Sequence, residues 1–199
     1  MSQKKPRLHL QNIIQTAAEI ADKEGIEAVT MAYLAKRLAI RPPSLYNHID
    51  GITELREKLA VYGLKKLYDK LAVATIGKAK DEAIYAFANA YLSFSRSHPG
   101  LYELTLSANL ENEEHILAGN KIIDLILKVL NGYHLEKETA LHAVRGLRSI
   151  LHGFSSLEQK GGFKLALDLN HSLHLLIDSF ILGINRYATT KIIKRSPLW

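Results

Sequence analysis

The chain has 199 residues, of which 47% are hydrophobic and 23% are charged, and it contains no cysteine. This balance is that of an ordinary globular protein and excludes an intrinsically disordered chain. The lack of cysteine excludes disulfide scaffolds, thiolate metal sites and cysteine nucleophiles.

Net charge and hydropathy bear on the protein's binding partners and on its location in the cell. The formal net charge of +6 is a weak sign of nucleic-acid binding, because lysine and arginine that neutralise phosphates release condensed counterions. The longest apolar stretches, such as residues 173–184, are interrupted by polar residues and are shorter than the roughly 18 to 20 residues of a bilayer span. Residues 1–7 are basic but lead into an amphipathic segment, unlike a secretory signal. We therefore expect no transmembrane helix and a cytoplasmic location.

The amino-terminal part of the chain begins with a helix and a short second one. Apolar residues recur at helical spacing over residues 8–23, and Gly25 ends this helix. Thr30 is a candidate N-cap for a short helix over residues 31–38. A longer helix is expected later, over residues 52–73.

Between these elements lies another short helix, predicted over residues 42–49. The two prolines at its start suit the first turn of a helix, where the N–H groups have no intrahelical partner. Leu45 and Ile49 form an inward-facing pair one turn apart. Two short helices joined by a tight turn have the spacing of a helix-turn-helix, here at about residues 29–48.

Residues 25–49 closely resemble the helix-turn-helix of tetracycline-repressor-like (TetR family) transcriptional regulators. The matching features are Ala17-Ala18, Gly25, Thr30, Leu34-Ala35 and Leu45-Tyr46-x-His48-Ile49. The resemblance covers about residues 7–60, and beyond them only the architecture is similar. It implies a ligand-responsive repressor that binds a palindromic operator in double-stranded DNA as a homodimer and is released by a small-molecule effector. It implies neither an enzyme nor a cofactor.

The resemblance also implies which residues contact DNA. The candidates are Thr30, Lys36, Arg37, Arg41, Pro43, Ser44, Tyr46, Asn47 and His48. Thr30, Tyr46 and His48 match positions that contact backbone phosphates in this family. Base reading would fall to the exposed start of the second short helix, where Arg41 suits guanine and Asn47 suits adenine. In an arbitrary helical domain, by contrast, the Tyr46 ring would more often pack into the core.

Three positions depart from the family pattern. Ala39 stands where the turn usually carries glycine, and Arg41 stands where a small polar N-cap is usual. Ile52 replaces a lysine that commonly contacts phosphate, which leaves that contact in doubt. The cations that could replace it are Lys36, Arg37, Arg56 and the basic arm of Lys4, Lys5 and Arg7. The arm is equally consistent with a solvated, disordered tail.

The rest of the chain continues the helical pattern. Five further helices are predicted over residues 81–97, 101–107, 113–130, 136–159 and 168–188, separated by glycine-, proline- and asparagine-rich breaks. The fold class is therefore all-α with about nine helices. We expect a DNA-binding domain over residues 6–66 and a helical domain for effector binding and dimerisation over residues 67–199.

The last two helices are unusually apolar for surface elements. Leucine, isoleucine and phenylalanine nearly encircle the final helix, and small residues such as Gly146, Gly153 and Gly183 would permit close approach of another helix. We expect a second copy of the chain to cover these helices in a four-helix interface. A simply buried central helix is the alternative.

A small-ligand site is expected among the middle helices. The candidate lining residues are Tyr85, Phe87, Tyr91, Phe94, Tyr102, Leu106, Ile126, Leu130, His142, Arg145 and Arg148. They combine apolar surface with a few polar groups, as ligand cavities do. Each one separately is more often a core residue.

Other functions have weaker signals. His171 and His174 lie one turn apart near Asp168 and Asp178, but no compact metal-binding motif is present, and no metal site is expected. The segment from residue 152 to residue 155 superficially resembles an oxyanion loop, but the nucleophile elbow of hydrolases is missing. A helical interaction protein that never contacts DNA is the more serious alternative.

Overall fold

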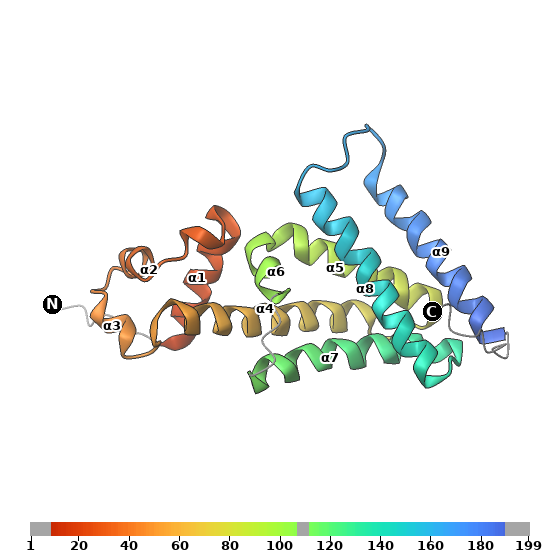
Figure 1. Ribbon diagram of the computed structural model, residues 1–199, viewed down its shortest axis with the longest axis horizontal. Coiled ribbons are helices and arrows are strands. Elements are labelled where there is room, and N and C mark those ends of the chain that lie inside the picture. Colours follow the sequence, from red (N-terminus) through yellow and green to blue (C-terminus); the bar gives the residue numbers. More distant parts are fainter. Residues whose placement is uncertain (1–8, 107–111, 190–199) are drawn as a thin grey trace, which may run out of the picture. The chain divides into compact units, whose positions relative to one another are not determined.

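The computed structural model describes residues 9–106 and 112–189, and this part of the chain is helical without a strand. The helices are α1 (Leu10–Glu24), α2 (Met31–Arg37), α3 (Pro43–Tyr46), α4 (Gly51–Thr75), α5 (Lys80–Ser97), α6 (Pro99–Thr105), α7 (Glu113–Leu130), α8 (Lys137–Gln159) and α9 (Leu169–Thr189), with 3₁₀ turns at Ile26–Ala28 and Asn131–Tyr133 (Figure 1). The predicted all-α class with about nine helices is confirmed for the residues that the structure describes. The basic arm of residues 4–7 lies outside the described residues.

Most helix bounds differ from the prediction by one or two residues, and two short helices differ most. Helix α3 has only four residues and ends at Tyr46, because the chain closes into a turn in which the N–H groups of His48 and Ile49 both donate to the Leu45 carbonyl. Helix α6 begins at Pro99, where the sequence predicted a break. The missing N–H of proline costs nothing at the first helical position, so Pro99 starts the helix instead of interrupting it.

The chain divides into two compact units. Unit one comprises the described parts of residues 1–66 and 97–118, and unit two comprises those of residues 67–96 and 119–199. Residues 97–118 therefore cluster with the amino-terminal unit, whereas a linear division after residue 66 would assign them to the second. Helices α4 and α7 each contribute residues to both units.

Unit one is built around α1 and α6. Helix α1 buries Ile13 and Ile20 completely. Its Asp22 carboxylate accepts a hydrogen bond from the Leu101 backbone N–H at 2.9 Å and lies 2.7 Å from the His98 ring Nδ1. A Cβ built on Gly100 would approach the carbonyl oxygen at position 21 to 2.2 Å, so only glycine permits this close packing. Helix α6 is thus fixed to the first helix of the unit.

In unit two, α8 and α9 lie side by side (Figure 1). The core contains Phe87 and Phe94 of α5 and Leu147 of α8, all at most 1% exposed. Ion pairs and hydrogen bonds tie the ends of the helices together: Arg96 lies 3.0 Å from the Glu158 carboxylate. These contacts stabilise a body made from helices far apart in the sequence.

Candidate nucleic-acid interface

The first helix of the helix-turn-helix is capped as the sequence predicts. The Thr30 hydroxyl oxygen accepts a hydrogen bond from the Tyr33 backbone N–H at 3.2 Å, and Thr30 has extended backbone angles. An N-cap of this kind satisfies one of the donors that the first turn leaves unpaired. Because the oxygen acts as acceptor here, the hydroxyl hydrogen of Thr30 is available to donate outward.

The turn after α2 is a Schellman motif with alanine in the glycine position. The Ile40 N–H donates to the Ala35 carbonyl at 3.0 Å and the Ala39 N–H donates to the Lys36 carbonyl at 3.1 Å. These are the two bonds that define the motif, and they require a left-handed residue between the helix and Ile40. Ala39 adopts that conformation with φ of 53°. The departure from glycine therefore leaves a left-handed turn in place and adds backbone strain.

The start of α3 explains how Arg41 can stand where a polar cap is usual. Pro42 and Pro43 have no N–H group, so two of the donors that a cap would satisfy do not exist. The next two N–H groups, of Ser44 and Leu45, donate to the carbonyls of Arg41 and Pro42 at 2.9 and 3.0 Å. The backbone thus needs no side-chain cap, and the side chain of Arg41 is exposed.

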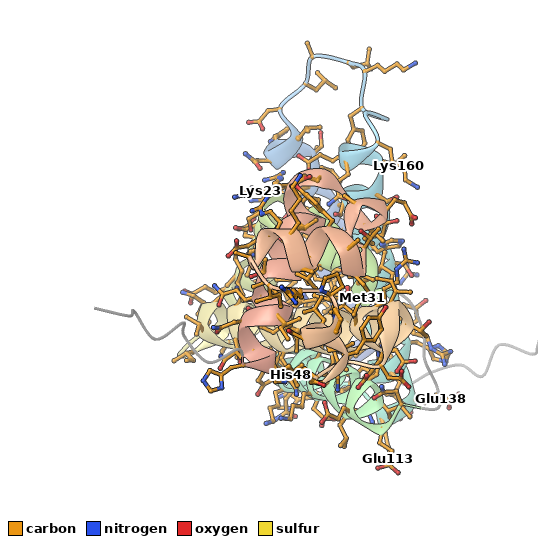
Figure 2. All side chains as sticks on the ribbon, turned by 90° about the vertical axis from the view of Figure 1, so that its left-hand side faces the viewer. Lys23, Met31, His48, Glu113, Glu138 and Lys160 are labelled. Atoms are coloured by element: carbon orange, nitrogen blue, oxygen red, sulfur yellow. The ribbon has the colours of Figure 1, made fainter. Side chains whose placement is uncertain are left out.

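Helix α3 and the turn after it have one buried side and one exposed side. Leu45 and Ile49 are at most 1% exposed and pack in the core of unit one together with Leu34 of α2. Tyr46 is 57% exposed, and Asn47 and His48 are also exposed. Figure 2 labels Met31 and His48 at the two ends of the helix-turn-helix. The apolar pair anchors the helix while the polar side chains face solvent.

The remaining predicted DNA-binding residues are also accessible. Pro43 is exposed and Ser44 is half-buried. Lys36 and Arg41 are exposed, and neither makes an ion pair within the part of the chain that the structure describes. Ile52, at the position where the family commonly has a lysine, is half-buried.

Two other cations of this region are paired with acids. Arg37 Nη1 lies 3.3 Å from Glu24 Oε1, and Arg56 Nη2 lies 3.4 Å from Glu27 Oε1. The Tyr33 hydroxyl, and then Glu24, raise the pKa of the Arg37 guanidinium above its ordinary value. Sequence reasoning missed these partners, because the residues of each pair are 13 and 29 positions apart.

Helix α4 begins with a carboxylate bonded to the backbone. The Glu54 carboxylate accepts a hydrogen bond from the Asp50 backbone N–H and pairs with Lys58 at 3.1 Å. These contacts, the backbone bond foremost, lower the pKa of Glu54 below its ordinary value. The negative charge also lies favourably at the amino end of a 25-residue helix.

The residues predicted to line a ligand cavity fall into two groups. The aromatic and aliphatic members Phe87, Tyr91, Phe94, Tyr102 and Ile126 are all at most 5% exposed. The polar members His142, Arg145 and Arg148 are exposed on α8. Tyr102 and Leu106 belong to unit one, and the other predicted members belong to unit two. Burial of this kind is consistent with a core as well as with a ligand cavity.

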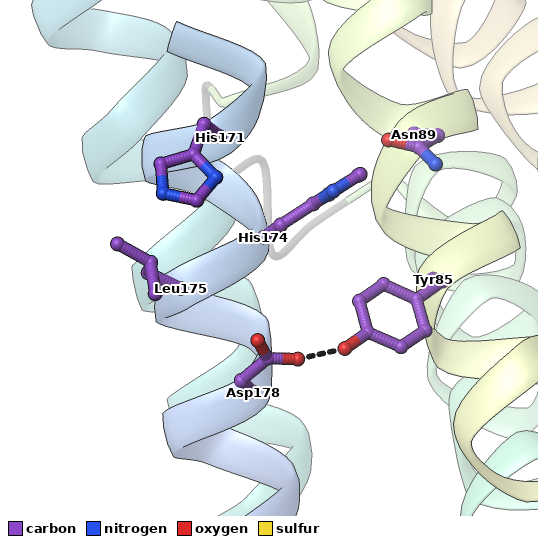
Figure 3. Close-up of a pocket in the computed structure, with 6 residues that line it drawn as sticks. All are labelled: Tyr85, Asn89, His171, His174, Leu175 and Asp178. Carbon is purple, nitrogen blue, oxygen red and sulfur yellow. Dashed lines mark hydrogen bonds between the residues drawn. The ribbon is translucent and has the colours of Figure 1, made fainter. Parts of the chain in front are cut away.

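Two surface hollows lie along α9 instead. One, of about 420 Å³, is lined by Tyr85 and Asn89 of α5 and by His171, His174, Leu175 and Asp178 of α9 (Figure 3). In it the Tyr85 hydroxyl donates to the Asp178 carboxylate, and the rings of Tyr85 and His174 meet edge to face at 5.6 Å. The other, of about 450 Å³, is more apolar and is lined by Phe154, Leu157, Phe163, Ser172, Leu175, Leu176 and Ser179. Of the predicted cavity residues, only Tyr85 lines either hollow.

Residues 9–106 and 112–189 contain neither a metal-binding cluster nor a helix that could span a membrane. This region has no group of three or more histidine or acidic side chains arranged to hold a metal ion. None of its helices combines the length and apolar character that crossing a bilayer requires.

Comparison with known proteins agrees with this geometry. Residues 13–59 match the family described as bacterial regulatory proteins, tetR family, and residues 84–180 match the tetracyclin repressor-like C-terminal domain. Among curated proteins, the uncharacterized HTH-type transcriptional regulator YobS of Bacillus subtilis (strain 168) is 43% identical over 183 residues, which cover 90% of this chain and 95% of that protein.

Solved structures share the fold. A protein of unknown function from Rhodococcus sp. RHA1 aligns with a TM-score of 0.79 at 20% identity over 92% of this chain and 98% of that one. A TetR variant from Acinetobacter baumannii AYE in complex with minocycline aligns with a TM-score of 0.70 at 18% identity. The alignment covers 92% of this chain and 100% of that one. Because both family models match and YobS is 43% identical, the chain belongs to the tetR family of bacterial transcriptional regulators, which bind DNA through a helix-turn-helix.

Proposed function

We propose that this protein binds a palindromic operator as a homodimer, represses transcription there, and is released by a small-molecule effector. The observation that carries the proposal is the two-sided character of α3 and its following turn. Leu45 and Ile49 anchor the segment, while Tyr46, Asn47 and His48 are exposed. A segment of this kind can enter the major groove and present polar side chains to base edges.

The exposed residues divide into two roles. Lys36, Tyr46 and His48, with the outward-donating hydroxyl of Thr30, position the helix by contacts to phosphates. The base-reading residues are Arg41, Pro43, Ser44 and Asn47. Supporting this division, the side chain of Arg41 is exposed and makes no ion pair among the described residues, so all five of its N–H donors are available.

The surface of α8 and α9 supports the homodimer. Leu157, Leu175, Leu176 and Leu182 are between 42% and 71% exposed within one chain. Leu157, Leu175 and Leu176 line one hollow together, and exposed apolar surface of this kind marks an interface. A two-fold axis through these helices would pair two recognition helices with half-sites about 34 Å apart.

Release by an effector is supported at the level of the family. The neighbour from Acinetobacter baumannii was solved with minocycline bound. We propose that unit two binds the effector of this chain, with Phe87, Tyr91, Phe94 and Ile126 as apolar contacts. The polar contacts would come from His142, Arg145 and Arg148. The effector and DNA would prefer different conformers of the protein. Binding of the effector would then shift the population away from the conformer that binds DNA.

The test is selection of bound duplexes from a random pool by the purified protein. We expect a two-fold symmetric consensus. Arg41→Ala should relax the preference at one base pair of each half-site by about 1 to 3 kcal/mol, whereas Tyr46→Phe should weaken all duplexes alike. If both variants lost affinity equally and kept the same preference, the division of roles would be wrong. Recovery of no duplex at low salt would favour a helical interaction protein instead.

A further inference from the structure

The end of α1 holds one arginine of α2 in a three-residue contact. Glu24 Oε1 accepts a hydrogen bond from the Tyr33 hydroxyl at 3.0 Å and lies 3.3 Å from Arg37 Nη1. Tyr33 and Arg37 are one turn apart on α2, so both reach the same carboxylate. The Tyr33 hydroxyl is neutral, and its bond therefore orients the Glu24 carboxylate without cancelling its charge.

The neighbouring lysine has a different environment. Lys36 precedes Arg37 on α2, is exposed and has no acidic partner in the described part of the chain. The same turn of helix thus carries one cation without an acidic partner among the described residues and one that is paired with a carboxylate. Since the proposed DNA-binding surface includes this turn, the two cations should contribute unequally to phosphate binding.

We propose that Glu24 is a positioning residue that withholds Arg37 from DNA phosphates and so reduces sequence-independent binding. This inference rests on the proposed DNA-binding function. A cation already paired with a carboxylate releases no counterion from DNA, and the carboxylate itself repels nearby phosphates. Base contacts by Arg41 do not depend on this pair. Lower non-specific affinity with unchanged base reading raises the ratio of specific to non-specific binding.

The experiment measures binding to a duplex of random sequence over a range of salt concentrations. Each phosphate neutralised contributes about 0.9 to the slope of log K against log salt. We expect Glu24→Gln to bind more tightly at low salt and to steepen the slope by about 0.9. Between about 50 and 200 mM salt this variant should lose about 3.5-fold more affinity than the wild type loses. Arg37→Gln should leave the slope unchanged, and the double variant should return to the wild-type slope.

Two controls separate this role from effects of charge or folding. Glu82→Gln removes the same charge and frees Lys78, its partner at 2.7 Å in unit two, and should leave the slope unchanged. Glu24→Gln and Arg37→Gln break the same surface pair, so a purely structural role predicts similar thermal stability for both and equal slopes throughout.

Several results would overturn the inference. Equal slopes in all variants would do so, as would a slope reduced by about 0.9 in Arg37→Gln, which would mean that Arg37 already contacts a phosphate. A double variant that kept the steeper slope of Glu24→Gln would show that the gain does not come from Arg37. A steeper slope in Glu82→Gln would indicate a general charge effect. Failure of the wild type to bind duplex at low salt would instead refute the proposed function, and this inference with it.

Discussion

The left-handed residue in the helix-turn-helix allows a quantitative test of backbone strain. Ala39 has φ of 53°, a conformation that costs a residue with a Cβ about 1 to 2 kcal/mol. Glycine avoids that cost, but its greater conformational entropy in the unfolded chain lowers the free energy of unfolding by about 0.4 to 1 kcal/mol. The side chain of Ala39 is exposed, so removal of its methyl group loses little packing. We therefore expect Ala39→Gly to raise the free energy of unfolding by about 0.5 to 1 kcal/mol.

Thermal unfolding followed by circular dichroism, at one fixed protein concentration, measures this change. For a chain of this size the gain corresponds to a rise in Tm of about 1 to 4 °C. The matched control is Ala32→Gly, which removes the same methyl group from an exposed position inside α2. There the substitution should lower stability by about 0.5 to 1 kcal/mol, because the backbone is helical. If Ala39→Gly lowered Tm as Ala32→Gly does, the turn would not be left-handed and the reasoning would be refuted.

Two further predictions concern packing and pH. Gly100→Ala should cost about 1 to 3 kcal/mol in urea unfolding, because its Cβ would meet the Ala21 carbonyl oxygen at 2.2 Å. Gly119→Ala, inside α7 with nothing within 4 Å of the new Cβ, should instead gain about 0.5 to 1 kcal/mol, and equal losses would contradict the contact. The pKa of Glu54 lies below its ordinary 4.5, chiefly through the Asp50 backbone N–H. The stability that this bond supplies is present above that pH and is lost as pH falls through the folded-state pKa. Glu54→Gln should flatten the fall of Tm between about pH 5 and pH 3, and an unchanged fall would exclude this origin.

The helices could be predicted from sequence because their determinants are local. Thr30 caps α2, and Gly25 ends α1 with φ of 88°, both as the pattern indicates. The predicted break over residues 98–100 is present but is confined to His98, because proline can start a helix as well as interrupt one. Here Asp22, 79 residues away from Leu101, supplies a hydrogen bond to the first turn of α6. No local pattern contains that partner.

The candidate DNA-binding site, too, could be predicted from sequence only where its determinants are local. Periodicity correctly placed Leu45 inward, because sidedness follows from the spacing of apolar residues along one helix, whereas the exposure of Tyr46 followed only from the family resemblance. Periodicity does not indicate whether two cations one residue apart are equally free to contact DNA phosphates. Lys36 and Arg37 look alike in the sequence, and only the folded position of Glu24 distinguishes them. Charge counts along the chain therefore overstate the cations that a DNA-binding surface can offer, and the salt dependence of binding should follow the cations that remain unpaired.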